Sequence, residues 1–277
     1  MAWRQRLKPL AVRLGVTSRI LWERSALAMY EHKRATNPEY RAWLEGAGRQ
    51  WVSDHWGTTS TADPVTWAHT ASQLFELTSL LRRRLGEVDT DGAGWMLDAG
   101  ASDGSFLSLL GIRRGVGANF LGICASKIRV DGYPAVLADL ERLPFGDRSF
   151  PLVVCCETLE HVPNPIASLR ELGRVCSGRI LLSIPWLSRT RVNSRPAGWP
   201  EVESHIFEFC EADFRKIVTH TGLTITFSSR VQVFPEPRNP LLRWWLAAWM
   251  YPSYFPVLQY YELAPSGPEG REGKQRS

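Results

Sequence analysis

From Trp95 onward, short apolar runs alternate with segments of helical periodicity, and this rhythm limits the fold more than any other feature of the sequence. The apolar runs cover residues 95–99, 119–124, 134–138, 150–156 and 179–184, and the helical patterns lie near 104–112, 164–175 and 211–222. Because consecutive parallel strands need a crossover connection, usually a helix, the alternation favours a parallel sheet with helices on both faces. Two further strands are predicted over 224–234 and 257–263. We therefore predict a seven-stranded, doubly wound α/β fold.

Composition and charge exclude several classes of protein. With 44% hydrophobic and 22% charged residues, the 277-residue chain has the composition of a folded globular protein. The net charge of +5 is concentrated at the start, because residues 1–34 hold eight Lys and Arg against two Asp and Glu. No zinc-finger, RNP or basic-zipper pattern accompanies this basic arm. We therefore expect no nucleic-acid partner.

The five cysteines are odd in number and form no Cys-x-x-Cys pair. They lie mostly in apolar stretches, and no signal peptide precedes them, so we expect free thiols in a reducing, cytoplasmic setting. Adjacent residues of a strand point to opposite faces, which prevents Cys155 and Cys156 from sharing an ion. The sequence thus predicts no metal site.

Residues 1–64 are interpreted as a basic, helical extension of the main domain. Residues 1–22 form a basic amphipathic segment with Leu7, Leu10 and Leu14 at helical spacing. Such a segment is typical of a membrane-surface anchor, an organelle transit peptide or a helix that covers the main domain. Residues 35–65 are interpreted as a linker or a lid on the substrate side. A helix is predicted over 65–84.

The segment from Trp95 to Phe106 contains the residues to which we assign chemistry. An apolar strand leads into Asp98, and the small residues Gly100, Ala101, Ser102 and Gly104 follow before a helix begins. Small residues let the backbone approach a ligand closely, and open α/β sheets bind ligands at the carboxyl ends of their strands. Taken alone, this glycine-rich loop is equally typical of an ordinary turn.

The loop does not stand alone, because five segments in order resemble the class I S-adenosylmethionine (SAM)-dependent methyltransferases. Asp98 to Gly104 is similar to that family's Asp-x-Gly-x-Gly-x-Gly cofactor loop. Residues 138–150 resemble its third-strand segment, where an Asp side chain and the next backbone amide meet the adenine. Cys155 to Pro163 resembles the fourth-strand end of the subgroup that includes quinone-biosynthesis methyltransferases. Residues 169–185 and 204–223 resemble the helix, strand and late helix that follow.

The resemblance covers about residues 65–235 and implies a Rossmann-like seven-stranded sheet with SAM as its cofactor. The residues that it implies at the cofactor are Asp98, Gly100, Ala101, Ser102, Gly104, Cys124, Asp139, Leu140 and Cys156. Two of them depart from the family pattern. Ser102 stands at a glycine position, which constrains the loop if the backbone φ is positive there. Cys124 stands where the family carries an acid for the ribose hydroxyls, and Cys is a weak acceptor.

Four titratable residues are expected near the mouth of the cofactor crevice: Glu157, Glu160, His161 and His205. A dedicated base is needed only when the methyl acceptor is a hydroxyl or an ammonium group. We identify His205 and Glu157 as the candidate catalytic residues. Glu160 is interpreted as structural, and His161 as a residue that braces the loop.

The methyltransferase domain is predicted over 65–264, with a Trp-rich insertion at 236–256 and a disordered tail at 265–277. The insertion holds Trp244, Trp245 and Trp249 beside Arg243. It is interpreted as a lid over an apolar acceptor, as a membrane-interface contact, or as a segment whose aromatic side chains pack on the edge of the sheet. The predicted function is methyl transfer to a small-molecule, sugar or lipid-linked acceptor. The alternatives are a catalytically inactive scaffold and a peripheral membrane-binding protein.

Overall fold

In the computed structural model, the described residues are 27–46, 64–86, 94–187, 190–192, 205–233 and 257–266, apart from 29, 103 and 131. The chain divides into two compact units, Met1–Glu76 with Gln232–Pro256 and Leu77–Val231 with Val257–Ser277. The predictions made for the basic segment 1–22, the Trp-rich segment 236–256 and the tail beyond residue 266 lie outside the described residues.

The first unit contains α3 (Pro38–Glu45), which lies within the segment interpreted as a linker or lid. Asn37 caps this helix by accepting a hydrogen bond from the Tyr40 amide at 2.9 Å. The Tyr40 ring is fully buried and packs edge-on against Phe75, with ring centroids 5.0 Å apart. Lys33 is also buried, and its Nζ lies 2.8 Å from Glu76 Oε1. The described part of this unit therefore combines aromatic packing with an ion pair whose lysine is buried.

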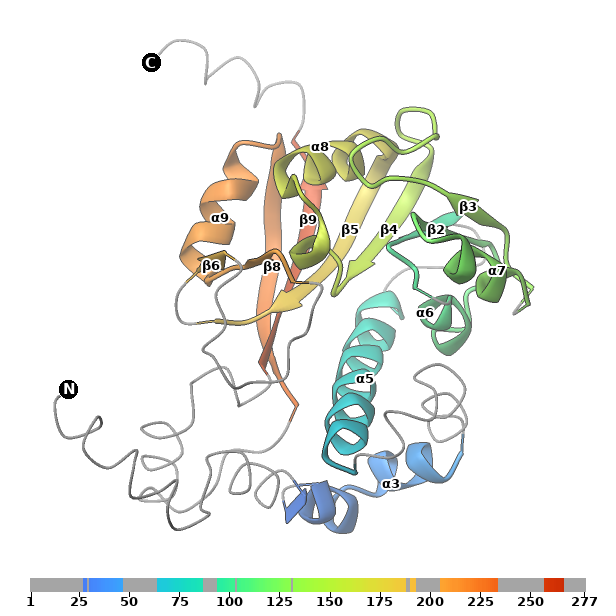
Figure 1. Cartoon of the computed structure of the whole chain (residues 1–277), viewed down its shortest axis with the longest axis vertical. Helices are drawn as coiled ribbons and strands as arrows, with labels where there is room; N and C mark the ends of the chain where they lie inside the picture. The colour runs from blue at the N-terminus through green and yellow to red at the C-terminus, as the bar shows by residue number, and fades with distance from the viewer. Residues whose placement is uncertain are drawn as a thin grey trace, which may run out of the picture. The chain divides into compact units, whose positions relative to one another are not determined.

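The second unit is built on a seven-stranded sheet of order β3-β2-β1-β4-β5-β9-β8. Figure 1 shows β4, β5, β9 and β8 side by side in that order. The strands are β1 (Met96–Ala99), β2 (Gly115–Asn119), β3 (Ala135–Leu137), β4 (Phe150–Cys156), β5 (Cys176–Pro185), β8 (Leu223–Gln232) and β9 (Val257–Pro265). The first five of these pair in parallel, and β9 is antiparallel to β5. The predicted seven-stranded, doubly wound sheet is confirmed.

Helices precede, connect and flank these strands (Figure 1), and two short strands form a second, two-stranded sheet. They are α5 (Pro64–Leu85), α6 (Ser105–Leu109), α7 (Gly122–Val130), η1 (Leu159–His161), α8 (Pro165–Val175) and α9 (Glu211–Thr219), and β6 (Arg191–Val192) pairs with β7 (Phe207–Glu208). The start of α8 is fixed by its sequence, because the Asn164 side chain caps the helix and Pro165 occupies its first turn.

The two faces of the sheet bury different kinds of residue. One face contributes apolar side chains such as Val153 and Leu182 to a core that includes Leu169 and Leu172 of α8 and Phe214 of α9. On the other face, the register aligns Asp98, Val154, Leu181 and Glu262 in one row across four strands. Asp98 and Glu262 are both buried. The acids of this unit's sheet are thus segregated from its main apolar core.

The second strand differs from the prediction. The apolar run 119–124 was expected to form it, but the strand is Gly115–Asn119, and Cys124 lies on α7. The strand is poor in apolar residues because α7 packs closely on it: a Cβ at Gly117 would lie 2.8 Å from Ile128 Cδ1. The connection from β2 to β3 is this helix. Phe120 and Leu121, which fall between strand and helix, are exposed.

Two further features concern the cysteines and the helices of the described residues. Cys155, Cys156, Cys176 and Cys210 are free thiols, as expected. No described helix is both long enough and apolar enough to cross a membrane.

Glu262 of β9 fastens the end of α5 to the sheet. The Arg84 guanidinium pairs with one of its carboxylate oxygens, and Arg179 of β5 lies 3.4 Å from the other. The Tyr260 hydroxyl donates a third hydrogen bond at 3.1 Å. Burial alone would raise the pKa of Glu262, but hydrogen bonds from Arg84 and Tyr260 outweigh it and hold the pKa below its usual range.

We expect Glu262→Gln to lower the free energy of unfolding by about 2 kcal/mol at pH 7, because the arginines lose a buried anionic partner. A depressed carboxyl pKa contributes stability that is present above the unfolded-state pKa and is lost as the pH falls through the folded-state pKa. The deficit should therefore shrink on acidification. Urea unfolding at several pH values measures it. Asp147→Asn, which removes an exposed partner of Arg174, should change stability by less than about 0.5 kcal/mol.

Candidate active site

The carboxyl ends of β1 and β4 meet at the point where the strand order reverses. The chain passes from β1 to β2 on one side and later to β4 on the other side of β1. Such a switch point leaves a crevice outside the strand ends, which is where open α/β sheets bind ligands. Asp98 lies next to last in β1, and Glu157 follows β4 directly. Both candidate residues therefore lie at this edge.

The loop after β1 has the tight geometry that its small residues allow. Gly100, Ser102 and Gly104 all have positive φ, at 83°, 43° and 84°. The amides of Gly100 and Ala101 both donate to the Ala118 carbonyl of β2, at 2.9 and 3.1 Å. Ser102 is exposed. The constraint anticipated at this position is therefore present, because a side chain occupies a left-handed conformation that glycine would adopt without strain.

The loops after β1 and β4 touch each other at Gly100. A Cβ placed on Gly100 would lie 2.2 Å from Thr158 Cγ2, which is an impossible contact. Thr158 is itself fixed, because its hydroxyl donates to the Cys156 carbonyl at 2.9 Å. Only glycine at position 100 permits this approach.

Of the residues expected to bind the ribose and the adenine, Asp139 and Leu140 follow β3, whereas Cys124 lies on α7 and Asn119 takes the end of β2. Asn119 ends β2, and its Oδ1 accepts a hydrogen bond from the Leu121 amide at 2.9 Å. Asp139 is exposed after β3, and its Oδ1 accepts from the Glu141 amide at 2.9 Å, whereas Leu140 is buried. The amide-bearing Asn119, rather than Cys124, thus ends the second strand.

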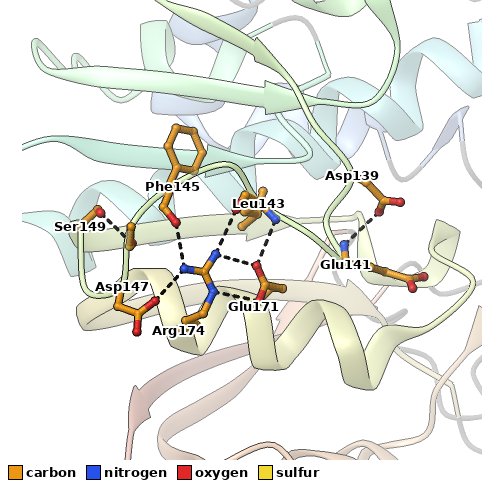
Figure 2. A network of polar contacts seen from close by, with 9 residues as sticks. Asp139, Glu141, Leu143, Phe145, Asp147, Ser149, Glu171 and Arg174 are labelled. Atoms are coloured by element: carbon orange, nitrogen blue, oxygen red, sulfur yellow. Dashed lines mark hydrogen bonds and ion pairs between the residues drawn. The ribbon is translucent and has the colours of Figure 1, made fainter.

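Arg174 of α8 holds the segment that carries Asp139 in place (Figure 2). Its guanidinium donates to the backbone carbonyls of Leu143 and Phe145, at 3.0 and 2.8 Å. It also pairs with the carboxylates of Glu171 and Asp147, each at 2.8 Å. The segment between β3 and β4 is therefore anchored along its length.

Glu157 sits in a strained and half-buried position after β4. Its φ is 49°, its amide donates to the Ser183 carbonyl at 3.1 Å, and its Oε1 accepts from the Ser183 hydroxyl at 2.8 Å. Burial raises the pKa of Glu157 to about 7, against the opposing effect of the Ser183 hydrogen bond. Cys156 beside it is a buried thiol whose pKa burial raises well above its usual range. Glu157 can therefore exchange a proton near neutral pH.

The structure also brings together the other three titratable residues named from the sequence. The Oε1 atom of Glu160 lies 3.9 Å from the Nε2 atoms of both His161 and His205. Burial raises the pKa of Glu160 well above its usual range, and the charge of Glu157 adds to this effect. Nδ1 of His205 lies 3.1 Å from Glu208 Oε1. All four residues expected at the mouth of the crevice thus interact.

Two partners in this site were missed by sequence reasoning. Ser183 lies inside an apolar strand, and only its alignment with Cys156 in the neighbouring strand brings it to Glu157. Glu208 lies within the segment that resembled the family, three residues after His205, but nothing in the sequence singled it out. The i to i+3 spacing from His205 is the one signal that could have indicated this contact.

Comparison with known protein families assigns this chain to a class of enzymes. A sequence family described as a methyltransferase domain matches residues 68–227, more than half of the chain. With the sheet order and the glycine loop, this match defines a class I SAM-dependent methyltransferase, with SAM as the cofactor. The chain belongs to the methyltransferase-domain family.

Solved structures of other proteins share the fold at low identity. The [4+2]-cyclase SpnF is 17% identical with a TM-score of 0.53, over 73% of this chain and 83% of that chain. A Burkholderia thailandensis 1,6-didemethyltoxoflavin-N1-methyltransferase, solved with 1,6-didemethyltoxoflavin and S-adenosylhomocysteine (SAH), is 17% identical with a TM-score of 0.52, over 83% and 90% of the two chains. An O-methyltransferase from a Brevibacillus brevis trans-AT PKS multienzyme, in complex with SAH, is 12% identical with a TM-score of 0.50, over 68% and 71%. A comparison with curated proteins found no match.

The Thr158 contact predicts a specific cost for a side chain at position 100. Gly100→Ala should lower the free energy of unfolding by about 1 kcal/mol for the positive φ and by a further 1–3 kcal/mol for the clash. Gly132→Ala is the matched control, because Gly132 has a φ of 86° and open space around its Cβ position. Denaturant unfolding and SAH titration measure the effect. Equal destabilisation, or SAH binding reduced equally in the two variants, would contradict the tight contact.

Proposed function

We propose that this methyltransferase methylates a hydroxyl oxygen of a small molecule, and that Glu157 accepts the proton released. The observation that carries the proposal is the half-buried carboxyl of Glu157, which follows β4 and accepts a hydrogen bond from Ser183, with a pKa of about 7. A proton acceptor of that pKa suits a neutral hydroxyl, since a base works best when its pKa lies near the operating pH.

The residues at the edge of the sheet fit the cofactor. The loop at 100–104 has two glycines in left-handed conformations and an exposed Ser102, so its backbone is accessible to a ligand. Asn119 and Asp139 lie at the ends of the next two strands, where polar side chains would bind hydroxyl and amino groups. The exposed Phe120 adds apolar surface for a flat ring. When bound, SAM supplies a methyl group on a positively charged sulfur.

The residue roles follow from these positions. Asp98, Gly100, Ala101, Ser102 and Gly104 would shape the cofactor loop, Asp139 and Leu140 would flank the adenine, and Cys156 would line the methionine side. Glu157 would receive the acceptor's proton while its backbone stays fixed by Ser183. His205 would lie on the acceptor side of the site, with its Nδ1 turned toward Glu208. Cys124 lies on α7, so a contact with the ribose would have to come from there.

A small molecule is the acceptor class that we favour. The Burkholderia thailandensis neighbour was solved with a small-molecule ligand beside SAH, and the Brevibacillus brevis neighbour is an O-methyltransferase. Sugar and lipid-linked hydroxyls are members of the same chemical class and belong in the same test panel.

The first test combines cofactor binding with transfer of a labelled methyl group. SAH at about 100 times its Kd should raise the thermal midpoint by about 5–10 °C. The chain is then incubated with methyl-labelled SAM and a panel of phenols, catechols, alcohols, sugars, lipid-linked alcohols, carboxylic acids and amines. We expect label on a hydroxyl compound. Label on amines or carboxylic acids alone would overturn hydroxyl methylation, and no SAH binding at millimolar concentration would favour the scaffold alternative.

The pH dependence tests the role of Glu157 directly. A base must be deprotonated to act, so kcat should rise with pH through about 7. Glu157→Gln should lower kcat by about 100-fold or more and abolish this rise, with little change in SAH affinity. Ser183→Ala is the informative companion, because the lost hydrogen bond should move the midpoint to higher pH while activity persists. A midpoint that stays fixed in Ser183→Ala would argue that another group titrates.

A further inference from the structure

Three potential metal-ligand atoms lie close together in this structure, one each from Glu160, His161 and His205. Their nearest ligand atoms all lie within 4.8 Å of one another, and Glu160 Oε1 is equidistant at 3.9 Å from the two Nε2 atoms. The two imidazole rings are 4.7 Å apart at 70°. Two residues come from η1, and the third precedes β7 far along the chain. Convergence of this kind arises from the fold, not from local sequence.

The carboxylate at the centre of this cluster lacks the contacts that its burial demands. The Glu160 side chain is 1% exposed. Within the part of the chain that the structure describes, neither of its carboxylate oxygens has a hydrogen-bond partner, and the histidines are its only ion-pair partners. Burying a carboxylate is costly unless it is paired or coordinates a metal. Glu160 therefore takes up either a proton, as its raised pKa indicates, or a cation at this point.

Neighbouring contacts hold the cluster in the arrangement of a metal centre. A histidine that ligates a metal usually gives its other ring nitrogen to a carboxylate, which fixes the orientation of the ring. His205 Nδ1 has such a partner in Glu208 Oε1 at 3.1 Å, so its Nε2 is directed to the cluster. The Ile206 amide donates to the Glu160 carbonyl at 2.7 Å, which fastens the two segments together.

We propose that Glu160, His161 and His205 bind one divalent transition-metal ion of the Zn²⁺ class. Two imidazole nitrogens and one carboxylate oxygen are a donor set that suits Zn²⁺ and its first-row neighbours better than Ca²⁺ or Mg²⁺. Ligand atoms at about 2.1 Å from a tetrahedral ion are about 3.4 Å apart. Each histidine Nε2 lies 3.9 Å from Glu160 Oε1, so these atoms need to approach one another by only about 0.5 Å. The side chains of His161 and His205 are 32% and 17% exposed, which leaves room for that rotation.

An ion at this position could bind the methyl acceptor. Three protein ligands leave a coordination position open, as in sites where a metal holds water or substrate. The ion would lie beside Glu157, whose charge reaches Glu160. An acceptor oxygen is then a suitable fourth ligand, held next to the group that takes its proton. This last step rests on the proposed function, whereas metal binding itself does not.

Metal titration of the intact chain tests the proposal. The protein is stripped with a chelator, desalted, and titrated with Zn²⁺ by calorimetry and with Co²⁺ by visible absorption. We expect one ion per chain, with no thiolate-to-Co²⁺ charge-transfer band. Glu160→Gln and His161→Ala should each weaken Zn²⁺ binding by at least about tenfold, and Glu208→Gln by about 10–100-fold. His220→Ala, a histidine remote in sequence from all three ligands, is the matched control and should bind as the wild type does.

Stability measurements keep loss of fold distinct from loss of metal. In chelator, Glu160→Gln should unfold at or above the wild-type temperature, because a buried charge is removed, and added Zn²⁺ should raise the midpoint of the wild type only. Glu208→Gln keeps the test valid if Glu160→Gln does not fold. Substoichiometric binding, a thiolate band, or wild-type affinity in Glu160→Gln or Glu208→Gln would each overturn the proposal. SAH calorimetry on the same samples separates this outcome from failure of the proposed function.

Discussion

The approach of the β1 and β4 loops at Gly100 is the constraint on which the rest of the site depends. Thr158 occupies the space that any side chain at position 100 would need, and it is itself tied to the end of β4. Bringing the two loops together positions the glycine loop and Glu157 at one edge of the sheet. The positive φ values of Gly100 and Glu157 are therefore two consequences of the same tight junction.

The buried acids of the second unit fall into two groups that differ in their partners. Glu262 is surrounded by Arg84, Arg179 and the Tyr260 hydroxyl, so its burial is compensated and its role is structural. Glu160 has two histidines and no arginine or lysine among its described partners. Natural proteins keep such uncompensated carboxyl groups where a proton or a cation is handled. This contrast distinguishes an acid that stabilises the fold, Glu262, from one that we propose to take part in binding, Glu160.

Most of the fold could be predicted because buried parallel strands are continuous apolar runs, as in β4 and β5. The second strand was wrong because its residues are small so that Ile128 of α7 can pack on Gly117, and the apolar Phe120 and Leu121 beyond it are exposed. The site was predicted only where resemblance supplied it. The meeting of His161 with His205, and of Glu157 with Ser183, depends on strand register and tertiary packing, which no local pattern encodes.

The shared fold does not by itself determine the reaction, since the structural neighbours include a [4+2]-cyclase as well as methyltransferases. The assignment of the reaction must rest on the chemical groups at the ends of the strands. In this chain those groups are a half-buried acid with a pKa near neutral, and a histidine pair around the buried acid Glu160. A base alone would serve many acceptors, but a base next to a cation site favours an acceptor that offers oxygen to the ion and a proton to the base. The two proposals are therefore compatible with the same class of substrate, an acceptor that offers a hydroxyl group.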